Sequence, residues 1–364
     1  MTLHIFNPEH DIALASNLSN FTAPHAARQL RYDMGWLPAL WADADDAIVV
    51  DDASYARQSY EWFLKCQLSR LPATEPVRLR LTAAAPCFVE WRLLRRERIQ
   101  TIRPWGWDRA LCRRLILQGV DVALLPSDET LDHVRQLSHR RLSMRLLPRL
   151  QQEGTVGESF VCTTEDEVQQ LLVRYDRLLL KAPWSSSGRG LRYLSTDRTP
   201  FAQHAGWFRN TVEAQGCVMA EPYYEKVKDF GMEFEALADG SVRYLGLSLF
   251  HTNNGAYTGN LLMTARAKEQ YLGRFLPASL LAEVRSRLCV ELARELQGRY
   301  TGPLGVDMMV VGSERATLLH PCVEVNLRRT MGHVALTLSP ADDDVQEAMR
   351  ITLSDHYQLK LHKL

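Results

Sequence analysis

The chain has 364 residues, of which 46% are hydrophobic and 24% charged, and its formal net charge at neutral pH is zero. This length allows two or three domains with a large buried core. The absence of net charge argues against non-specific attraction to nucleic acid or to an anionic membrane. No apolar run approaches the roughly 20 residues of a membrane span, and the N-terminus lacks the pattern of a signal peptide. We therefore expect a cytoplasmic protein whose partners are small molecules or proteins.

The first 135 or so residues have the pattern of an α/β unit. An apolar strand is expected over Leu3–Phe6, and two more over Ala47–Val50 and Val120–Leu125. A helix through Arg109 precedes the third strand, and a helix that leads into a strand is typical of a parallel sheet. We therefore expect residues 1–135 to form a domain around such a sheet.

The remaining residues, 136–364, alternate between helices and strands in a second unit. The expected strands are short apolar runs, which cover residues 159–162, 177–182, 218–221, 232–237, 242–250, 305–311 and 322–326. Thr164 and Glu167 form a capping box that predicts a helix after the first of these strands. A long amphipathic helix is expected from Pro277 to Gln297. No linker rich in proline and serine separates the units, so we expect them to be docked against each other.

The last two of these strands carry acids and an amide at alternating positions. Alternation places Glu324 and Asn326 on one face of their strand. If the strand of Asp307 pairs with it across the turn at residues 312–315, a third oxygen joins them. A small number of hard oxygen ligands suits Mg²⁺ that also binds substrate phosphates. The alternative is an ordinary hairpin whose acids face solvent.

Lys181 ends an apolar strand and precedes a loop of three serines and two glycines. Glycine allows a close approach, so the backbone N–H groups and hydroxyls of such a loop can turn onto phosphate oxygens. An ordinary hairpin turn has a similar composition. A lysine in a buried layer costs free energy unless it meets an anion, however. The candidate phosphate-binding residues are therefore Lys181, Ser185, Ser186, Ser187 and Gly188.

Two acids follow in the next segment. Glu221 ends the strand that begins at Val218, at a place where the chain could cross between two lobes. Its carboxylate could there accept a hydrogen bond from an adenine amine. Asp229 comes after a polar stretch and is placed to accept from a ribose hydroxyl. The alternative is a solvated loop whose acids face water.

Taken in order, these elements resemble the ATP-grasp superfamily over roughly Ser138 to the C-terminus. The resemblance is carried by Lys181 before the Ser/Gly loop, Glu221-Pro222, Gly305-Val306-Asp307 and the segment from Glu324 to Arg328. It implies an α/β protein in which two α+β lobes, residues 136–217 and 218–364, clamp ATP. It also implies that a Rossmann-like domain, residues 1–135, precedes them and helps to bind substrate.

The resemblance also implies individual roles. Lys181 would contact the α- and β-phosphates, the loop from Ser185 would cover the triphosphate, Glu221 would read adenine, Asp229 would hold ribose, and Asp307, Glu324 and Asn326 would hold Mg²⁺. Arg141, or its neighbour Arg140, matches the basic residue that opens the ATP-binding lobe, where the family commonly has lysine. Arg328 or Arg329 could stabilise the transferred phosphate, because arginine presents a fixed fork of donors, and the other could form a structural ion pair.

The chemistry that the resemblance implies is activation of a small-molecule carboxylate as an acylphosphate, followed by attack of an amine or thiol. Lys181 and Arg328 would be the catalytic residues, with ATP and Mg²⁺ as cofactors. Two alternatives stay open: a phosphotransferase that acts on a non-carboxylate acceptor, and a nucleotide-binding protein without turnover. The complete metal set argues against the second. ATP-grasp enzymes often dimerise, so a homodimer is a further expectation.

Two polar stretches are candidates for holding the substrate. One follows the first strand, where ligands tend to sit in a parallel sheet, although Asp11 could instead cap a helix that begins at Ile12. The other, from His251 to Asn260, is interpreted as a long loop between a strand and a helix, and such a loop could also be a plain connection. The candidate substrate residues are Asn7, Glu9, His10, His251, Asn254 and Asn260.

Overall fold

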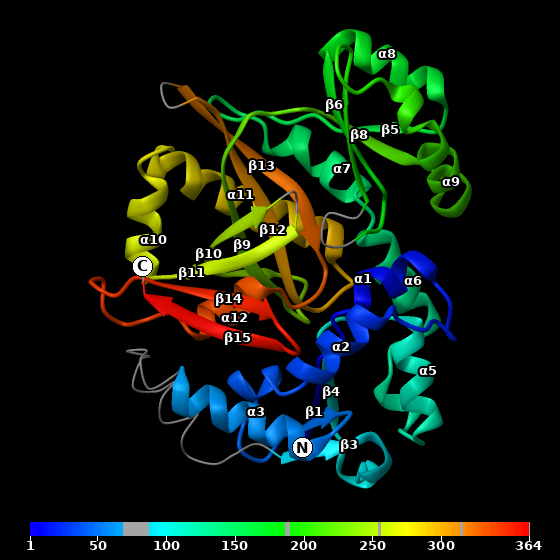
Figure 1. The fold of residues 1–364 in the computed structure, drawn as a ribbon, viewed down its shortest axis with the longest axis vertical. Coiled ribbons are helices and arrows are strands. Elements are labelled where there is room, and N and C mark those ends of the chain that lie inside the picture. Colours follow the sequence, from blue (N-terminus) through cyan, green and yellow to red (C-terminus); the bar gives the residue numbers. More distant parts are fainter. Residues whose placement is uncertain (68–86, 186–189, 254–255, 314–315, 364) are drawn as a thin grey trace.

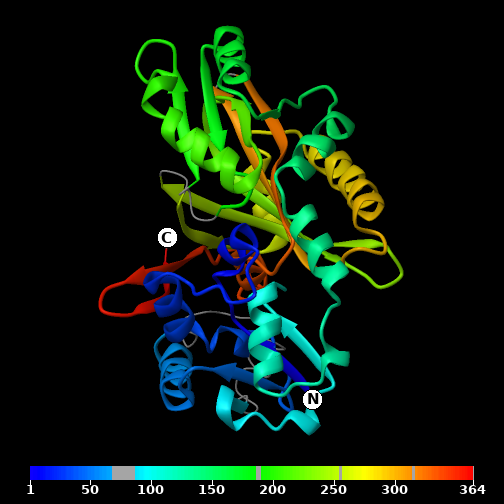
Figure 2. The same ribbon diagram turned by 90° about the vertical axis from the view of Figure 1, so that its right-hand side faces the viewer.

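A computed structural model describes residues 1–67, 87–185, 190–253, 256–313 and 316–363 of the chain. It contains a four-stranded parallel sheet near the N-terminus and two further sheets of four and seven strands. Figure 2 shows the smaller of these at one end of the molecule, the N-terminal unit at the other, and the seven-stranded sheet between them. The predicted α/β class is confirmed.

The N-terminal sheet has the strand order β3-β2-β1-β4, and all neighbouring strands are parallel. Its strands are β1 (Thr2–Ile5), β2 (Ala47–Val50), β3 (Cys87–Glu90) and β4 (Thr101–Pro104). Alternate residues of β2 face two different apolar clusters: Ile48 and Val50 join one, whereas Ala47 and Val49 join the other. Both faces are therefore covered, as expected for a parallel sheet. The helices of this unit are α1 (His10–Ser16), α2 (His25–Met34), α3 (Ala53–Cys66), α5 (Arg109–Leu117) and α6 (Asp128–Leu137).

The strand predicted over Val120–Leu125 is wrong. The chain there forms a short 3₁₀ helix, Val122–Leu124. Asp121 accepts a hydrogen bond from the backbone N–H of Ala123, which starts the turn, and Val122 is 64% exposed. A run of apolar letters predicts a strand only when a sheet is present to bury it, and β4 instead supplies the fourth strand.

The small sheet has the order β5-β8-β6-β7, with antiparallel pairs throughout. Its strands are β5 (Phe160–Cys162), β6 (Arg177–Lys181), β7 (Leu191–Ser195) and β8 (Val218–Pro222), and the helices nearby are α7 (Arg141–Leu150), α8 (Glu165–Tyr175) and α9 (Ala205–Gln215). The predicted capping box is present at the start of α8, where Thr164 and Glu167 satisfy each other's backbone N–H groups. Residues 186–189 of the Ser/Gly loop lie outside the described residues.

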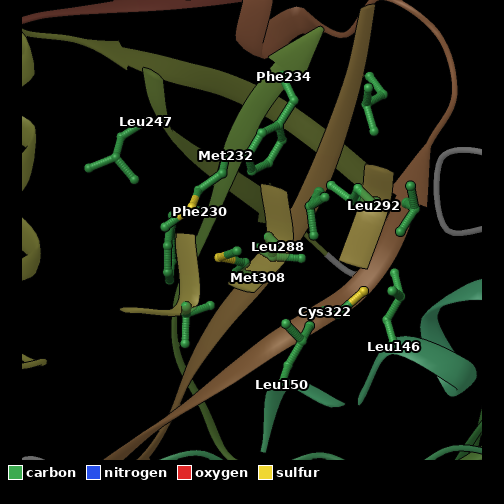
Figure 3. Close-up of a cluster of buried hydrophobic side chains, with 14 of the residues drawn as sticks. Leu146, Leu150, Phe230, Met232, Phe234, Leu247, Leu288, Leu292, Met308 and Cys322 are labelled. Atoms are coloured by element: carbon green, nitrogen blue, oxygen red, sulfur yellow. The ribbon is translucent and has the colours of Figure 1, made fainter. Parts of the chain in front are cut away.

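The large sheet has the order β13-β12-β9-β10-β11-β14-β15. Its strands are β9 (Lys226–Ala236), β10 (Val242–Asn253), β11 (Ala256–Leu262), β12 (Gly302–Ser313), β13 (Ala316–Asn326), β14 (Glu347–Leu353) and β15 (Tyr357–Lys363). The helices are α10 (Ala265–Leu272), α11 (Ala278–Leu296) and α12 (Met331–Thr337). Figure 3 shows Leu288 and Leu292 of α11 among the side chains of Met232, Phe234 and Met308, in the largest apolar cluster of the described residues.

The C-terminal hairpin lies against the N-terminal unit. The backbone N–H of Tyr357 donates to Asp33 at 2.8 Å, and that of Leu361 donates to Gln67 at 2.8 Å. Figure 1 shows β14 and β15, in red, beside α2 and α3, in blue. An apolar cluster therefore continues from the first sheet into the last strands. The proposed division at residues 135 and 217 stays a prediction. No helix among the described residues is long and apolar enough to cross a membrane.

Candidate functional site

A cavity of about 450 Å³ opens between the small sheet and the large sheet, and it reaches the end of β1. Three separate parts of the chain therefore contribute to its wall. Of the residues predicted from the sequence, those that line it are Lys181, Ser185, Glu221, Asp229, Asn260, Asp307, Glu324, Asn326 and Arg328. The structure brings together groups that are far apart in sequence, such as Asp11 and Arg328, which are separated by 317 positions.

The hairpin of β12 and β13 places the candidate metal ligands side by side. Asp307 lies directly opposite Glu324, and Gly305 lies opposite Asn326, as the alternation predicts. The register then shifts between Asp307 and Met309, so the ladder is interrupted next to these side chains. The hairpin predicted across residues 312–315 is thus confirmed, and its acids do not simply face solvent, because they line the cavity.

The two carboxylates in this hairpin oppose each other electrostatically. Burial, reinforced by the nearby Glu324 carboxylate, raises the pKa of Asp307 to about 7. Like charges directly opposite each other destabilise an antiparallel pair. Two contacts offset the repulsion: Asn326 Nδ2 donates to Asp307 Oδ2 at 3.1 Å, and Arg140 NH2 lies 2.8 Å from Glu324. A divalent cation between the two carboxylates would stabilise both in their charged form.

The donor set suits magnesium in particular. Among the described residues, no group of three or more His, Cys, Asp or Glu side chains is arranged to hold a metal ion. The hairpin offers two carboxylates and one amide oxygen instead. Mg²⁺ binds in this way in nucleotide sites, where one or two carboxylates hold it and phosphates and waters supply the other oxygens. The residues present therefore fit a magnesium ion that arrives with a phosphate ligand.

Arg328, not its neighbour, faces the cavity. Its guanidinium donates twice to Asp11, with both distances at 2.8 Å, and once to Asn326 Oδ1 at 3.1 Å. Burial acts to lower the pKa of Arg328, but the carboxylates of Asp11, Glu324 and Asp307 raise it above its usual value. Arg329 instead stacks over the ring of Trp41 at 4.4 Å, and burial lowers its pKa to about 10. Of the two arginines that the sequence left open, Arg328 lines the cavity and Arg329 does not.

Lys181 and Glu221 form an ion pair on the opposite wall. Lys181 Nζ lies 2.6 Å from Glu221 Oε2, and both side chains are less than a tenth exposed. Their strands are adjacent, with Leu179 opposite Glu221 and Lys181 opposite Met219. The expectation that Lys181 meets an anion in a buried layer is thus met by a protein carboxylate. Both side chains line the cavity, so both could also contact a bound ligand.

Arg140 occupies the position for which Arg141 was the first choice. Arg140 is 7% exposed and lines the cavity, where it donates to Ala182 O at 2.6 Å and to Ser185 Oγ at 3.1 Å. Arg141 is the first residue of α7 and is exposed. Since consecutive residues at a helix start point in different directions, only one of them can face the cavity. Of the two residues that matched the family position, Arg140 is therefore the one that lines the cavity.

The polar residues after β1 separate into two groups. Asp11 faces the cavity and holds Arg328, whereas Asn7 and Glu9 line a different cavity. The side-chain amide of Asn7 is hydrogen-bonded within the protein, because it donates to Gly106 O and accepts from Gly106 N. His10 is 1% exposed, and it does not line the first cavity. The helix begins at His10, not Ile12, and Asp11 makes no capping bond.

The stretch from His251 to Asn260 is not a long loop. It forms the end of β10 and the start of β11, which are paired as a hairpin. Phe250 and Thr252 line the cavity, so His251 between them faces away from it and is exposed. Asn260 is 1% exposed, lines the cavity and donates to Ser248 Oγ at 2.8 Å. The predicted residue Asn254 lies outside the described residues, as do Ser186, Ser187 and Gly188.

Asp229 lies in β9, not in a loop. Its carboxylate accepts from Lys226 Nζ at 2.6 Å and from Thr252 Oγ1 at 2.5 Å. The sequence reading placed the start of this strand six residues too late, at Met232, because the charged residues before it suggested a solvated turn. The longer strand brings Asp229 into the large sheet opposite Met309.

Glu233, which the sequence analysis missed, lies on the same face of β9 as Asp229 and lines the cavity. It is 3% exposed, and Thr330 Oγ1 donates to it at 2.7 Å. Burial raises the pKa of Glu233 to about 8. The spacing of four residues from Asp229, within a strand whose intervening residues are apolar, is the signal that would have found it. It marks a polar end of the cavity, together with Ser248 and Tyr257.

The fold is similar to solved structures of nucleotide-dependent enzymes. N5-Carboxyaminoimidazole synthetase from Staphylococcus aureus complexed with ADP superposes with a TM-score of 0.51 at 10% identity, over 97% of this chain and 82% of that chain. The biotin carboxylase–β,γ-ATP complex from Campylobacter jejuni gives a TM-score of 0.50 at 13% identity, over 96% and 75% of the two chains. No family model matches the chain, and no curated protein matches it in sequence. At these identities the likeness shows the fold: the chain has the ATP-grasp fold that its motifs predict.

Proposed function

We propose that the protein is an ATP- and Mg²⁺-dependent ligase that activates a small-molecule carboxylate as an acylphosphate for attack by an amine or thiol. The observation that carries the proposal is the facing pair Asp307 and Glu324 in the same cavity as Arg328. Two half-buried acids that repel each other beside a fixed guanidinium suit a site for Mg²⁺ and a transferred phosphate. The fold supports the same reading, since both similar structures named above were solved with a nucleotide or its analogue.

The cavity also supports roles for its other residues. In the proposed complex Asp307, Glu324 and Asn326 hold Mg²⁺, Lys181 and Arg140 contact phosphate oxygens, Glu221 accepts from the adenine amine, and Asp229 accepts from ribose. Ser185, which begins the Ser/Gly loop and lines the cavity, contacts the triphosphate. In this arrangement residues 1–135 form the Rossmann-like domain, and residues 136–217 and 218–364 form the two lobes of the clamp.

Protein groups mainly position and neutralise in such a reaction. The metal supplies charge neutralisation for the phosphoryl group when it is bound. Arg328 adds a fixed positive charge, and its two bonds to Asp11 hold the guanidinium in one orientation. Asp11 therefore acts as a positioning residue. The acceptor is proposed to enter at the polar end of the cavity, where Glu233 and Asn260 are buried.

The test is a screen of amino acids and small carboxylates for stimulated ADP release in the presence of Mg²⁺. With the active carboxylate, addition of hydroxylamine is expected to trap an acylhydroxamate. Glu324→Gln, which keeps the shape but removes a charge, is expected to lower the rate by about 10²–10³-fold, as does loss of one group that stabilises the transition state. Glu213→Gln, at an exposed position in α9, is the matched control and should keep the full rate.

Each alternative predicts a different result. Stimulated ADP release without hydroxamate, with phosphate recovered on the acceptor, would indicate a phosphotransferase. ATP binding without any turnover would indicate a nucleotide-binding protein. Failure to bind ATP in calorimetry with Mg²⁺ would refute the nucleotide site itself. A homodimer and a cytoplasmic location stay predictions of the sequence.

A further inference from the structure

A second cavity, of about 310 Å³, lies on the other side of the segment that leaves β1. Ile5, Asn7 and Glu9 line it, whereas Phe6 and Pro8 line the nucleotide cavity. From Ile5 to Asn7 successive residues of the extended chain point to opposite sides, and the turn at Pro8 and Glu9 follows. The two cavities share no lining residue. A molecule in the second cavity therefore lies behind the wall of the first and is not a reactant there. This volume suits a small metabolite.

Positive charge is in excess around the second cavity. Arg31 and Arg114 are both tied to Asp51, and Arg31 also pairs with Glu9. Arg28 and Arg113 line the same cavity, are exposed, and have no ion-pair partner among the described residues. Two guanidinium groups without a protein carboxylate at the mouth of a cavity favour an anionic ligand, because arginine matches the geometry of carboxylate oxygens.

One buried acceptor in this cavity lacks a donor. Glu9 is 9% exposed, and its Oε1 pairs with Arg31, but Oε2 has no hydrogen-bond partner among the described residues. The other acid of the lining, Asp108, is fully engaged: it accepts from Leu111 N at 2.9 Å and from Asn7 Nδ2 at 3.2 Å. Leaving a buried carboxylate oxygen without a donor is costly. A ligand that donates a hydrogen bond to Glu9 Oε2 would remove this cost.

Part of the remaining wall is apolar, although Ser19, Asn20 and Thr22 also line it. Phe21, Trp91, Leu111 and Leu117 line the cavity. Arg114 stacks on the ring of Trp91, with 3.7 Å between the guanidinium carbon and the ring centre, which fixes that ring. A ligand that fills this space therefore needs an apolar body as well as its charged groups.

We propose that the second cavity binds an amino acid with an apolar side chain, as a regulatory ligand separate from the reactants. Its carboxylate meets Arg28 and Arg113, its ammonium group donates to Glu9 Oε2, and its side chain packs against Trp91 and Phe21. Such a ligand bears on the first cavity through α1, because Glu9 immediately precedes this helix and Asp11 in its first turn holds Arg328.

Calorimetry without nucleotide tests the site independently of the proposed ligase activity. The probes are L-phenylalanine, L-leucine and L-methionine, together with 3-phenylpropanoate, which lacks the ammonium group, and phenethylamine, which lacks the carboxylate. At least one of the three amino acids is expected to bind. The two analogues, 3-phenylpropanoate and phenethylamine, are each expected to bind about tenfold more weakly than phenylalanine, since each loses a charged hydrogen bond. Saturation with MgATP should leave the number of amino acid sites unchanged.

Substitutions of the exposed Arg28 and Arg113 test the site even if a change at the buried Glu9 unfolds the protein. Arg28→Ala and Arg113→Ala, at exposed positions, are each expected to weaken binding about tenfold, whereas Arg198→Ala, at an exposed position after β7 in the small sheet, should leave it unchanged. Glu9→Gln, checked for folding by thermal melting, should reduce the preference for phenylalanine over 3-phenylpropanoate. Absence of binding by all three amino acids at millimolar concentration, or binding that MgATP displaces, would overturn the proposal.

Discussion

The two walls of the cavity between the small and the large sheet carry charges in opposite arrangements. On the small sheet Lys181 and Glu221 neutralise each other at 2.6 Å. On the large sheet Asp307 and Glu324 have the same sign and face each other across a strand pair, and the pKa of Asp307 is raised to about 7. The first wall is balanced without a ligand, whereas on the second Arg140 pairs with Glu324 and leaves Asp307 without an ion-pair partner among the described residues.

This difference separates two uses of a buried charge. A paired charge on a rigid strand can hold its position while the cavity is empty, so that a ligand finds it in place. Two carboxylates that face each other instead favour binding of a cation, because the cation removes the repulsion between them. The first arrangement is expected to matter most for folding, and the second most for ligand-dependent stability.

Removal of Lys181 should have the largest effect on stability. Lys181→Met leaves Glu221 buried without its partner, and loss of one member of a buried pair costs about 3–5 kcal/mol in the free energy of unfolding. The double variant Lys181→Met/Glu221→Leu should recover most of this loss, because two apolar side chains replace the pair. Urea unfolding of the single and double variants measures both quantities.

A surface pair provides the control for that experiment. Arg209 and Glu165 pair at 2.7 Å with side chains 65% and 42% exposed. Arg209→Met should therefore change the unfolding free energy by less than about 1 kcal/mol. Equal losses for Lys181→Met and Arg209→Met would show that the inner pair is not desolvated as the structure indicates.

The opposite wall should respond to magnesium, and the response should depend on pH. Because the pKa of Asp307 is raised in the folded protein, from 3.8 to about 7, its stabilising contribution is full below the lower value and is lost as pH rises through the upper one. Mg²⁺ competes with the proton and restores that loss. Thermal melting should therefore show a larger stabilisation by Mg²⁺ with ADP at about pH 8 than at about pH 6.

Glu324→Gln tests whether the cation is held between Asp307 and Glu324. The variant removes the like charge, so the folded protein without metal should lose less stability on going from acid to neutral pH. Its gain from Mg²⁺ with ADP should also fall at both pH values. If the variant keeps the pH-dependent gain of the unchanged protein, then the cation is not held between Asp307 and Glu324.

Much of this contrast was predictable from the sequence, since it depends on local strand alternation. Glu324 and Asn326 share a face whatever the fold around them, and Lys181 at the end of an apolar run requires an anion nearby. Both predictions hold in the structure. The identity of the anion was not predictable, because Glu221 becomes adjacent to Lys181 only through the pairing of β6 with β8.

The errors have physical reasons of the same kind. His251 and Asn260 were placed together in one loop, but the hairpin of β10 and β11 turns one away from the cavity and the other into it. The composition of that stretch, rich in Asn, Gly and Thr, is typical of turns, and only pairing within a sheet overrides it. After β1, similarly, the chain turns into α1, where residues two apart point in nearly opposite directions, so Glu9 and Asp11 line different cavities.

A smaller test concerns the charge balance behind Lys181. His320 in β13 is 1% exposed, and burial, together with the positive charge of Lys181, lowers its pKa from 6.5 to about 3. Both ring nitrogens lack hydrogen-bond partners among the described residues. The neutral ring therefore stabilises the fold above about pH 6.5, and this contribution is lost as pH falls through the window toward about 3.

Replacing His320 should thus reduce the acid sensitivity of the protein. One such group contributes at most about 1.4 kcal/mol per pH unit to the slope of unfolding free energy against pH. His320→Gln should lower the slope between about pH 6 and pH 4 by roughly this amount, whatever it does to the stability at neutral pH. His25→Gln, at an exposed position, should leave the slope unchanged. An unaltered slope in His320→Gln would mean that the ring takes up its proton before the protein unfolds. It would also mean that Glu221 alone fully neutralises the positive charge of Lys181, so that Lys181 does not lower the pKa of His320.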